Sequence, residues 1–151
     1  MSQPVNSVHH SVCQAIAALL LVAPVLALGN VVANRKRPMP LGINSQIFVY
    51  FEESSATRGE IRNAPVDWRT RVRVECVARD VPGQLAETTA DAMGVQVYAR
   101  VMADVSLGGL ALDVIPLAVG LAADEADAGL AAYQLMFEVW HRSQEGSIAA
   151  A

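Results

Sequence analysis

The sequence predicts an α+β fold, with an antiparallel or mixed β-sheet of about four to five strands and two α-helices packed on one face. Two observations carry this prediction. Two segments repeat apolar residues at helical spacing, and the segments between and after them are rich in β-branched and aromatic residues. The chain has 151 residues, of which 53% are hydrophobic. It can therefore form a single domain, residues 1–151, with its own core.

The first helix is expected from Ser7 to Ala23. Ser7 or Asn6 can cap its start, and Pro24 ends it. The segment from Ala15 to Leu28 has no charge, but it is shorter than the roughly 20 apolar residues that cross a membrane. A signal peptide requires a basic start, but no basic residue precedes Arg35. A core helix is therefore expected, and a signal peptide or membrane anchor is the alternative. An apolar stripe supports the core helix: Val12, Ile16, Leu19 and Leu20.

Three strands are expected next. Residues 31–39 predict a short strand that carries Arg35, Lys36 and Arg37, and the prolines at 38 and 40 exclude it from the sheet centre. Residues 46–53, QIFVYFEE, predict the second strand, and the polar residues 54–65 predict a flexible loop. Residues 68–79 predict a half-buried strand, because apolar and charged side chains alternate along it.

The second helix is expected over residues 84–104. Its buried face is Ala86, Ala90, Met93, Val97 and Val101. A second face comprises Leu85, Thr89, Ala92 and Ala99, which predicts packing on two sides. Gly94 within this helix weakens it by about 1 kcal/mol relative to alanine.

The remaining chain predicts a loop within residues 107–121, a strand after Pro116, an acidic turn at 124–129 and a last strand at 130–142. Tyr133, Leu135, Phe137 and Val139 are expected on one face of that strand. Gln134, Met136, Glu138, Trp140 and Arg142 are expected on the other. Residues 1–6 and 143–151 are expected to be flexible.

No complete catalytic, cofactor or metal motif occurs in the sequence, so we expect neither an enzyme nor a cofactor. His10 and Cys13 share a helical face, but two ligands make a weak metal site. His141 is expected at the surface. The acidic residues at 124, 125 and 127 lack the ligand pattern of a calcium loop. Two cysteines, Cys13 and Cys76, predict free buried thiols.

The charges are divided unevenly along the chain. Residues 1–34 carry none, residues 35–79 carry nine basic and five acidic side chains, and residues 80–151 carry two basic and ten acidic ones. The net charge of -4 argues against a free nucleic-acid binder. A molecule with one basic and one acidic part can associate head to tail with its own copies.

Three arginines, Arg69, Arg71 and Arg73, project from one face of the predicted strand 68–79. Like charges in a row repel, so acids or phosphates should oppose them. Glu52 or Glu138 on neighbouring strands, acids of a second subunit, and phosphates are the three alternatives.

The chain resembles the tail terminator proteins of long-tailed bacteriophages, the minor tail protein U family, over roughly residues 8–143. The resemblance lies in the element order and in five segments: QIFVYFEE, DWRTRVRVECVAR, GQLAETTADAMGVQVYARVMAD, LGGLALDV and LMFEVWHRS. It implies an α/β fold and a six-membered ring that sits on the tail tube. Such a ring stops tube polymerisation and offers a surface for the head connector.

The resemblance also implies the partners. They are further copies of the chain, the tail tube protein, a head–tail connector or stopper protein, and DNA that passes through the ring without sequence-specific binding. The expected location is the virion tail or neck, and the host cytoplasm during assembly. Six residues are candidates for inter-subunit or lumen-facing positions: Arg69, Arg71, Arg73, Glu52, Glu138 and Trp140. A connector or stopper ring protein and a small membrane-anchored protein are the alternatives.

Overall fold

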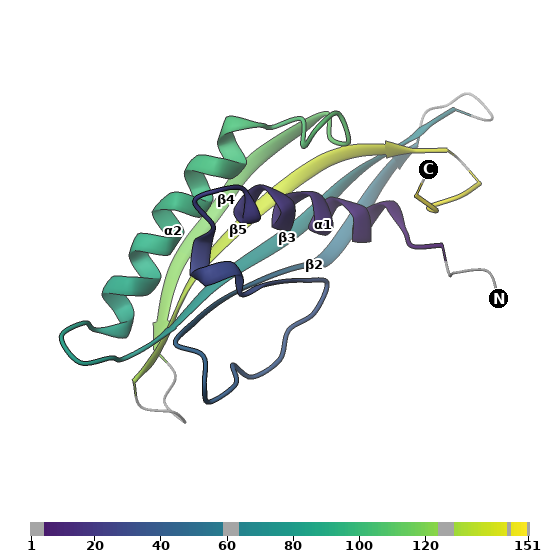
Figure 1. Ribbon diagram of the computed structural model, residues 1–151. Coiled ribbons are helices and arrows are strands. Elements are labelled where there is room, and N and C mark those ends of the chain that lie inside the picture. The colour runs from purple at the N-terminus through teal and green to yellow at the C-terminus, as the bar shows by residue number, and fades with distance from the viewer. Residues whose placement is uncertain (1–4, 59–63, 124–128, 145, 151) are drawn as a thin grey trace.

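A computed structural model describes residues 5–58, 64–123, 129–144 and 146–150. It shows one five-stranded mixed sheet with two α-helices on the same face, which confirms the predicted fold class (Figure 1). The elements in chain order are α1 (Val8–Leu21), the 3₁₀ turn η1 (Leu26–Gly29), β1 (Val31–Ala33), β2 (Ser45–Arg58), β3 (Val66–Arg79), α2 (Ala86–Ala103), β4 (Asp113–Ala123) and β5 (Leu130–Ser143).

The strands lie in the order β1-β2-β3-β5-β4. β1 runs parallel to β2, and every other neighbouring pair is antiparallel. Val74 at the centre of β3 stands opposite Val49 of β2 and Leu135 of β5, and all three side chains are buried. The alternation predicted for residues 68–79 and 130–142 is therefore confirmed, because one face of each strand points into the core beneath the helices.

Three strand boundaries differ from the prediction. β2 continues to Arg58, where a loop was expected from Ser54, because cross-strand pairing with β3 continues to Val66 and outweighs the polar composition. β1 ends at Ala33, so the basic run at 35–37 lies outside it. Asn34 has a left-handed φ of 60°, which ends the extended backbone.

The third difference concerns β4, which begins at Asp113 and not after Pro116. β4 is an edge strand, and its register shifts between Pro116 and Ala118. Proline is tolerated at edges and bulges because its missing N–H is not needed there. The acidic turn predicted at 124–129 lies outside the described residues except for Gly129.

The helix α1 fills the core as predicted. Of the predicted stripe, Val12, Ile16 and Leu20 are fully buried, and Leu19 is only partly buried against the core. The Ser7 hydroxyl accepts a hydrogen bond from the His10 backbone N–H at 3.2 Å, which confirms the cap. No helix in the described part of the chain is long and apolar enough to cross a membrane.

The helix α2 buries the predicted face, Ala86, Ala90, Met93, Val97 and Val101. The predicted packing of its second face is wrong within the single chain. Leu85, Ala92 and Ala99 are exposed, because the sheet covers only one side of the helix. Arg100 of α2 donates hydrogen bonds to four carbonyl oxygens at the end of α1, those of Leu19, Leu20, Val22 and Pro24.

The two ends of the described chain lie together. The Val8 N–H donates to the Ile148 carbonyl at 2.7 Å, and the Ala150 N–H donates to the Asn6 carbonyl at 2.8 Å. Flexibility of residues 1–6 and 143–151 stays a prediction.

Candidate functional site

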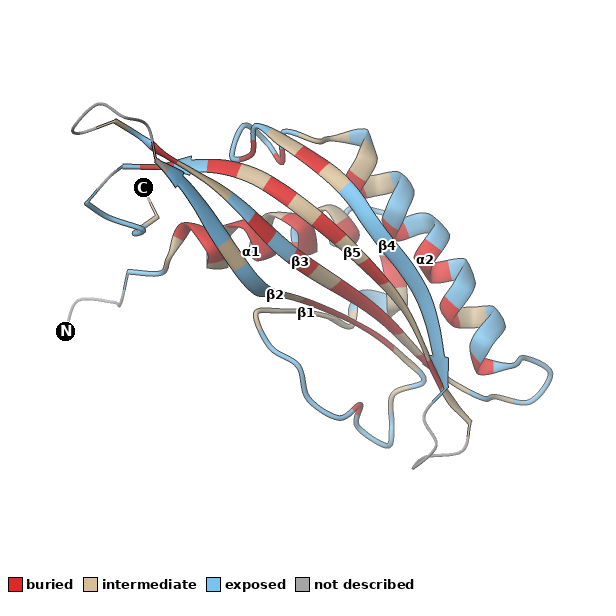
Figure 2. Ribbon diagram, turned by 180° about the vertical axis from the view of Figure 1, so that it is seen from behind, coloured by how far each residue is buried: buried red, intermediate tan, exposed pale blue. Residues whose placement is uncertain are grey.

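The sheet face opposite the helices is open over much of its area, and we call it the outer face (Figure 2). The alternation along β3 places its charged residues here, because their neighbours in sequence are buried in the core. Twelve charged side chains belong to it: Lys36, Glu52, Glu53, Asp67, Arg69, Arg71, Arg73, Glu75, Arg79, Asp113, Glu138 and Arg142.

Two of the three arginines in the row pair with carboxylates of β2. The Arg73 Nε lies 2.6 Å from the Glu52 Oε1, and an Arg71 guanidinium nitrogen lies 3.3 Å from the Glu53 Oε1. The register of β2 shifts between Phe51 and Glu53, and this bulge turns two consecutive carboxylates toward the same face. Intramolecular acids therefore oppose this part of the row.

The third arginine, Arg69, stacks on an aromatic ring. Its guanidinium lies 4.4 Å from the centre of the Trp140 ring, which stands directly opposite it on β5. The Trp140 indole N–H donates to the Glu138 Oε1 at 2.7 Å. Glu138 is the register partner of Arg71, yet its carboxylate is held by the indole. The structure thus gathers all six predicted site residues on one face.

Both ends of the outer face carry a further ion pair. Arg142 donates two hydrogen bonds to the Asp67 carboxylate, at 2.7 and 3.4 Å, and this lowers the pKa of Asp67. Glu75 is only 2% exposed, and its Oε1 lies 3.1 Å from the Lys36 Nζ and 2.7 Å from the Tyr50 hydroxyl. The six basic and six acidic side chains named for the outer face balance in charge.

Glu53 and Lys36 are outer-face partners that the sequence pattern does not predict. Two adjacent acids in a strand normally point to opposite faces, so only the bulge brings Glu53 to Arg71. Lys36 reaches Glu75 because the segment after β1 folds over the outer face, where Met39 and Phe48 are buried. The sequence feature that could have predicted the Lys36 contact is Glu75, a lone acid in the apolar half of β3, because a buried charge requires a partner.

The predicted surface position of His141 is wrong. Its side chain is 1% exposed, and its Nε2 lies 2.5 Å from the Thr70 hydroxyl. His9 of α1 packs edge-on to it, with ring centres 5.1 Å apart, and contacts the Trp68 ring at 4.9 Å. Burial, and then the charge of His9, lowers the pKa of His141 to about 4. Burial likewise lowers the pKa of His9.

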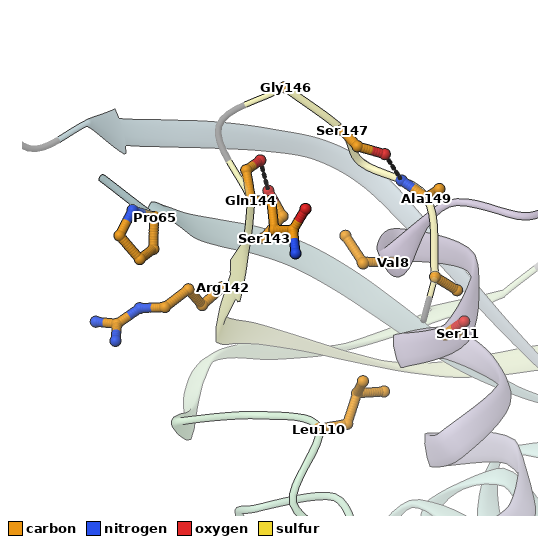
Figure 3. Close-up of a pocket in the computed structure, with 11 residues that line it drawn as sticks. Val8, Ser11, Pro65, Leu110, Arg142, Ser143, Gln144, Gly146, Ser147 and Ala149 are labelled. Atoms are coloured by element: carbon orange, nitrogen blue, oxygen red, sulfur yellow. Dashed lines mark hydrogen bonds between the residues drawn. The ribbon is translucent and has the colours of Figure 1, made fainter. Parts of the chain in front are cut away.

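An open hollow of about 970 Å³ lies between the start of α1 and the segment after β5 (Figure 3). Val8, Ser11 and Leu110 line it together with the small residues of that segment. Its charged side chain, Arg142, is already bound to Asp67. The hollow therefore offers no unpaired charge from its described lining to a ligand.

The described residues contain no group of three or more His, Cys, Asp or Glu side chains placed to hold a metal ion. Cys13 and Cys76 are free and buried, as predicted. Burial raises the pKa of each thiol to about 12, so neither is reactive in the folded chain.

No protein-family model matches the chain, and no curated protein sequence matches it. Among the solved structures that match, one chain comes from the virion of a native gene transfer agent particle. It has 16% sequence identity to this chain and a TM-score of 0.52. The match covers 86% of this chain and 93% of that chain. The similarity establishes a shared fold over nearly the whole of both chains.

Proposed function

We propose that this chain is a structural protein of a phage-like virion, and more narrowly a tail terminator. In this role it forms a ring that caps the tail tube, stops its polymerisation and joins it to the head. The single observation that carries the proposal is the shared fold with a virion chain, which covers 93% of that chain. The sequence resemblance to tail terminators points independently in the same direction.

The outer face suits a surface along which DNA passes. Its charges balance, and Arg71 and Arg73 are already paired with Glu53 and Glu52. Strong phosphate binding needs unpaired basic side chains that displace counterions. A face with paired charges can line a channel without holding the DNA, so we place the row of Arg69, Arg71 and Arg73 toward the ring lumen.

The proposed partners are further copies of the chain in a hexamer, the tail tube protein and a head–tail connector or stopper protein. The proposed location is the tail or neck of the virion, after assembly in the host cytoplasm. A connector or stopper ring is the second candidate, because the shared fold with a virion chain supports it equally.

Polymerisation of purified tail tube protein in vitro, followed with and without this chain, tests the proposal. Adding the chain should arrest tube growth and leave a ring at one tube end in negative-stain images. Tubes that grow at the same rate and keep bare ends would contradict the terminator role. Binding to isolated head connectors together with bare tube ends would favour the connector role.

A further inference from the structure

The edge strand β4 carries an exposed apolar surface. Figure 2 shows β4 exposed over most of its length, from Pro116 to its end at Ala123. Leu117, Val119 and Leu121 are 43%, 60% and 53% exposed. No charged residue occurs between Asp113 and the end of the strand at Ala123.

Such an edge normally requires protection. A free edge presents unpaired backbone N–H and C=O groups, and proteins block it with lysines, prolines, short strands or covering segments. Pro116 and its bulge protect only the first part of β4. The part from Ala118 to Ala123 remains available for another strand.

The opposite edge of the sheet is β1, and it lies level with this part of β4. The strand registers connect the two edges in two rows across the sheet. One row contains Val31, Ile47, Cys76, Tyr133 and Leu121. The other contains Ala33, Val49, Val74, Leu135 and Val119. All ten side chains point to the helix side, because the central residues of both rows belong to the core.

A second copy that continues the sheet would therefore place β4 beside the β1 of its neighbour. β1 and β5 run in the direction opposite to β4, so the new pair would be antiparallel. Val119 would then meet Ala33, and Leu121 would meet Val31, on the same face. Apolar cross-strand pairs of this kind stabilise an antiparallel edge contact.

The charges at one end of the sheet agree with this arrangement. Glu87 and Asp91 are exposed in the first turns of α2, at the end of the sheet where β4 stops. Arg35 and Arg37 are exposed in the segment that follows β1, close to Lys36 at Glu75. In side-by-side copies the acidic residues would lie on the helix side of the β4 edge and the basic residues on the outer-face side of the β1 edge, so they would attract each other across the contact without forming direct ion pairs.

We infer that the β4 and α2 side of one copy docks on the β1 side of a second copy, and that this is the contact between ring subunits. The inference deepens the proposed function and rests on it for the ring. The contact joins two different surfaces, so it can close a ring by repetition. A two-fold contact between two β4 strands would instead leave β1, Arg35 and Arg37 without a partner copy.

Val119→Lys tests the contact, because lysine on an edge strand blocks pairing. Ile148→Lys is the control, since Ile148 is 49% exposed in the segment after β5, away from the β4 and α2 side and from β1. Both variants should melt like the wild type. Val119→Lys should raise the concentration for half-assembly, measured by light scattering, by at least about tenfold, and Ile148→Lys should leave it nearly unchanged.

Cross-linking identifies the two surfaces directly. A mixture of Val119→Cys and Ala33→Cys chains should form covalent dimers with a short bismaleimide, and neither variant should do so alone. The native cysteines are buried and should not react. Dimers from Val119→Cys alone would overturn the inference in favour of a β4–β4 contact.

A Val119→Lys variant that assembles normally would also overturn the inferred contact and would leave the terminator proposal standing. A wild-type chain that never self-associates would overturn the contact, whereas arrest of tube growth tests the terminator role separately.

Discussion

At the scale of single residues, Gly94 shows how packing can reverse a preference read from sequence. Glycine within a helix is unfavourable by about 1 kcal/mol relative to alanine. In the structure, a Cβ atom at Gly94 would lie 2.2 Å from the Tyr133 ring. The glycine is therefore required by the close approach of α2 to β5, which no periodicity in the sequence reveals.

Gly94→Ala should lower the free energy of unfolding by about 1–3 kcal/mol, because the added methyl group overpacks the helix–sheet contact. Chemical denaturation measures this change. In a Tyr133→Ala background the same substitution should instead raise the stability by up to about 1 kcal/mol. A stabilising effect in the wild-type background would contradict the packing account.

The buried histidine pair predicts a loss of stability in mild acid. His141 is neutral when folded, with a pKa of about 4, and its ordinary value is 6.5. A lowered histidine pKa means that the unfolded chain binds more protons between these values. The free energy of unfolding should thus be highest above pH 6.5 and fall as the pH decreases toward 4, by up to about 3 kcal/mol.

Chemical denaturation of the wild type and of His141→Gln at several pH values measures how much His141 contributes to this pH dependence. The comparison separates it from carboxylates that titrate in the same pH range. The variant should lose less stability over the window. An His10→Gln control should follow the wild type, because His10 lies outside the buried pair. Equal pH dependence in all three proteins would show that His141 does not titrate as proposed.

At the scale of elements, the sequence predicted those whose periodicity is strong and local. α1, β3, α2 and β5 were recognised because each alternates apolar and polar residues at its own period. The second half of β2 was missed, since its polar residues form a strand only through pairing with β3. The outer-face residues were grouped correctly, but their partners depend on the β2 bulge and on the segment after β1.

The end of α1 depends on a side chain from α2. The last carbonyl groups of a helix lack intrahelical partners, and Arg100 donates to four carbonyl oxygens at this end. Arg100→Met keeps the apolar stem and removes these donors, so it should lower the free energy of unfolding by roughly 1–3 kcal/mol. Gln96→Met, on the exposed side of α2, should change it by less than about 0.5 kcal/mol. An equal free energy of unfolding for both variants would show that water satisfies these carbonyl groups as well as Arg100 does.

At the scale of the whole molecule, the balance of the outer face makes a prediction about DNA. Glu52→Gln with Glu53→Gln releases Arg71 and Arg73 from their ion pairs. The double variant should bind double-stranded DNA at least severalfold more tightly at low salt, with a steeper salt dependence. Asp104→Asn removes an acid at the end of α2, outside the outer face and the proposed subunit contact, and should have a much smaller effect. Equal DNA binding by this variant and the double variant would mean that the outer face is not special for DNA.

Native mass spectrometry of the purified protein shows directly whether copies of this chain close into a ring. The subunit mass is 16.1 kDa. We expect one dominant closed assembly, a hexamer, whose size stays fixed as the protein concentration rises. A protein that remains monomeric, also when tail tubes are present, or an open series of ever larger oligomers, would contradict it.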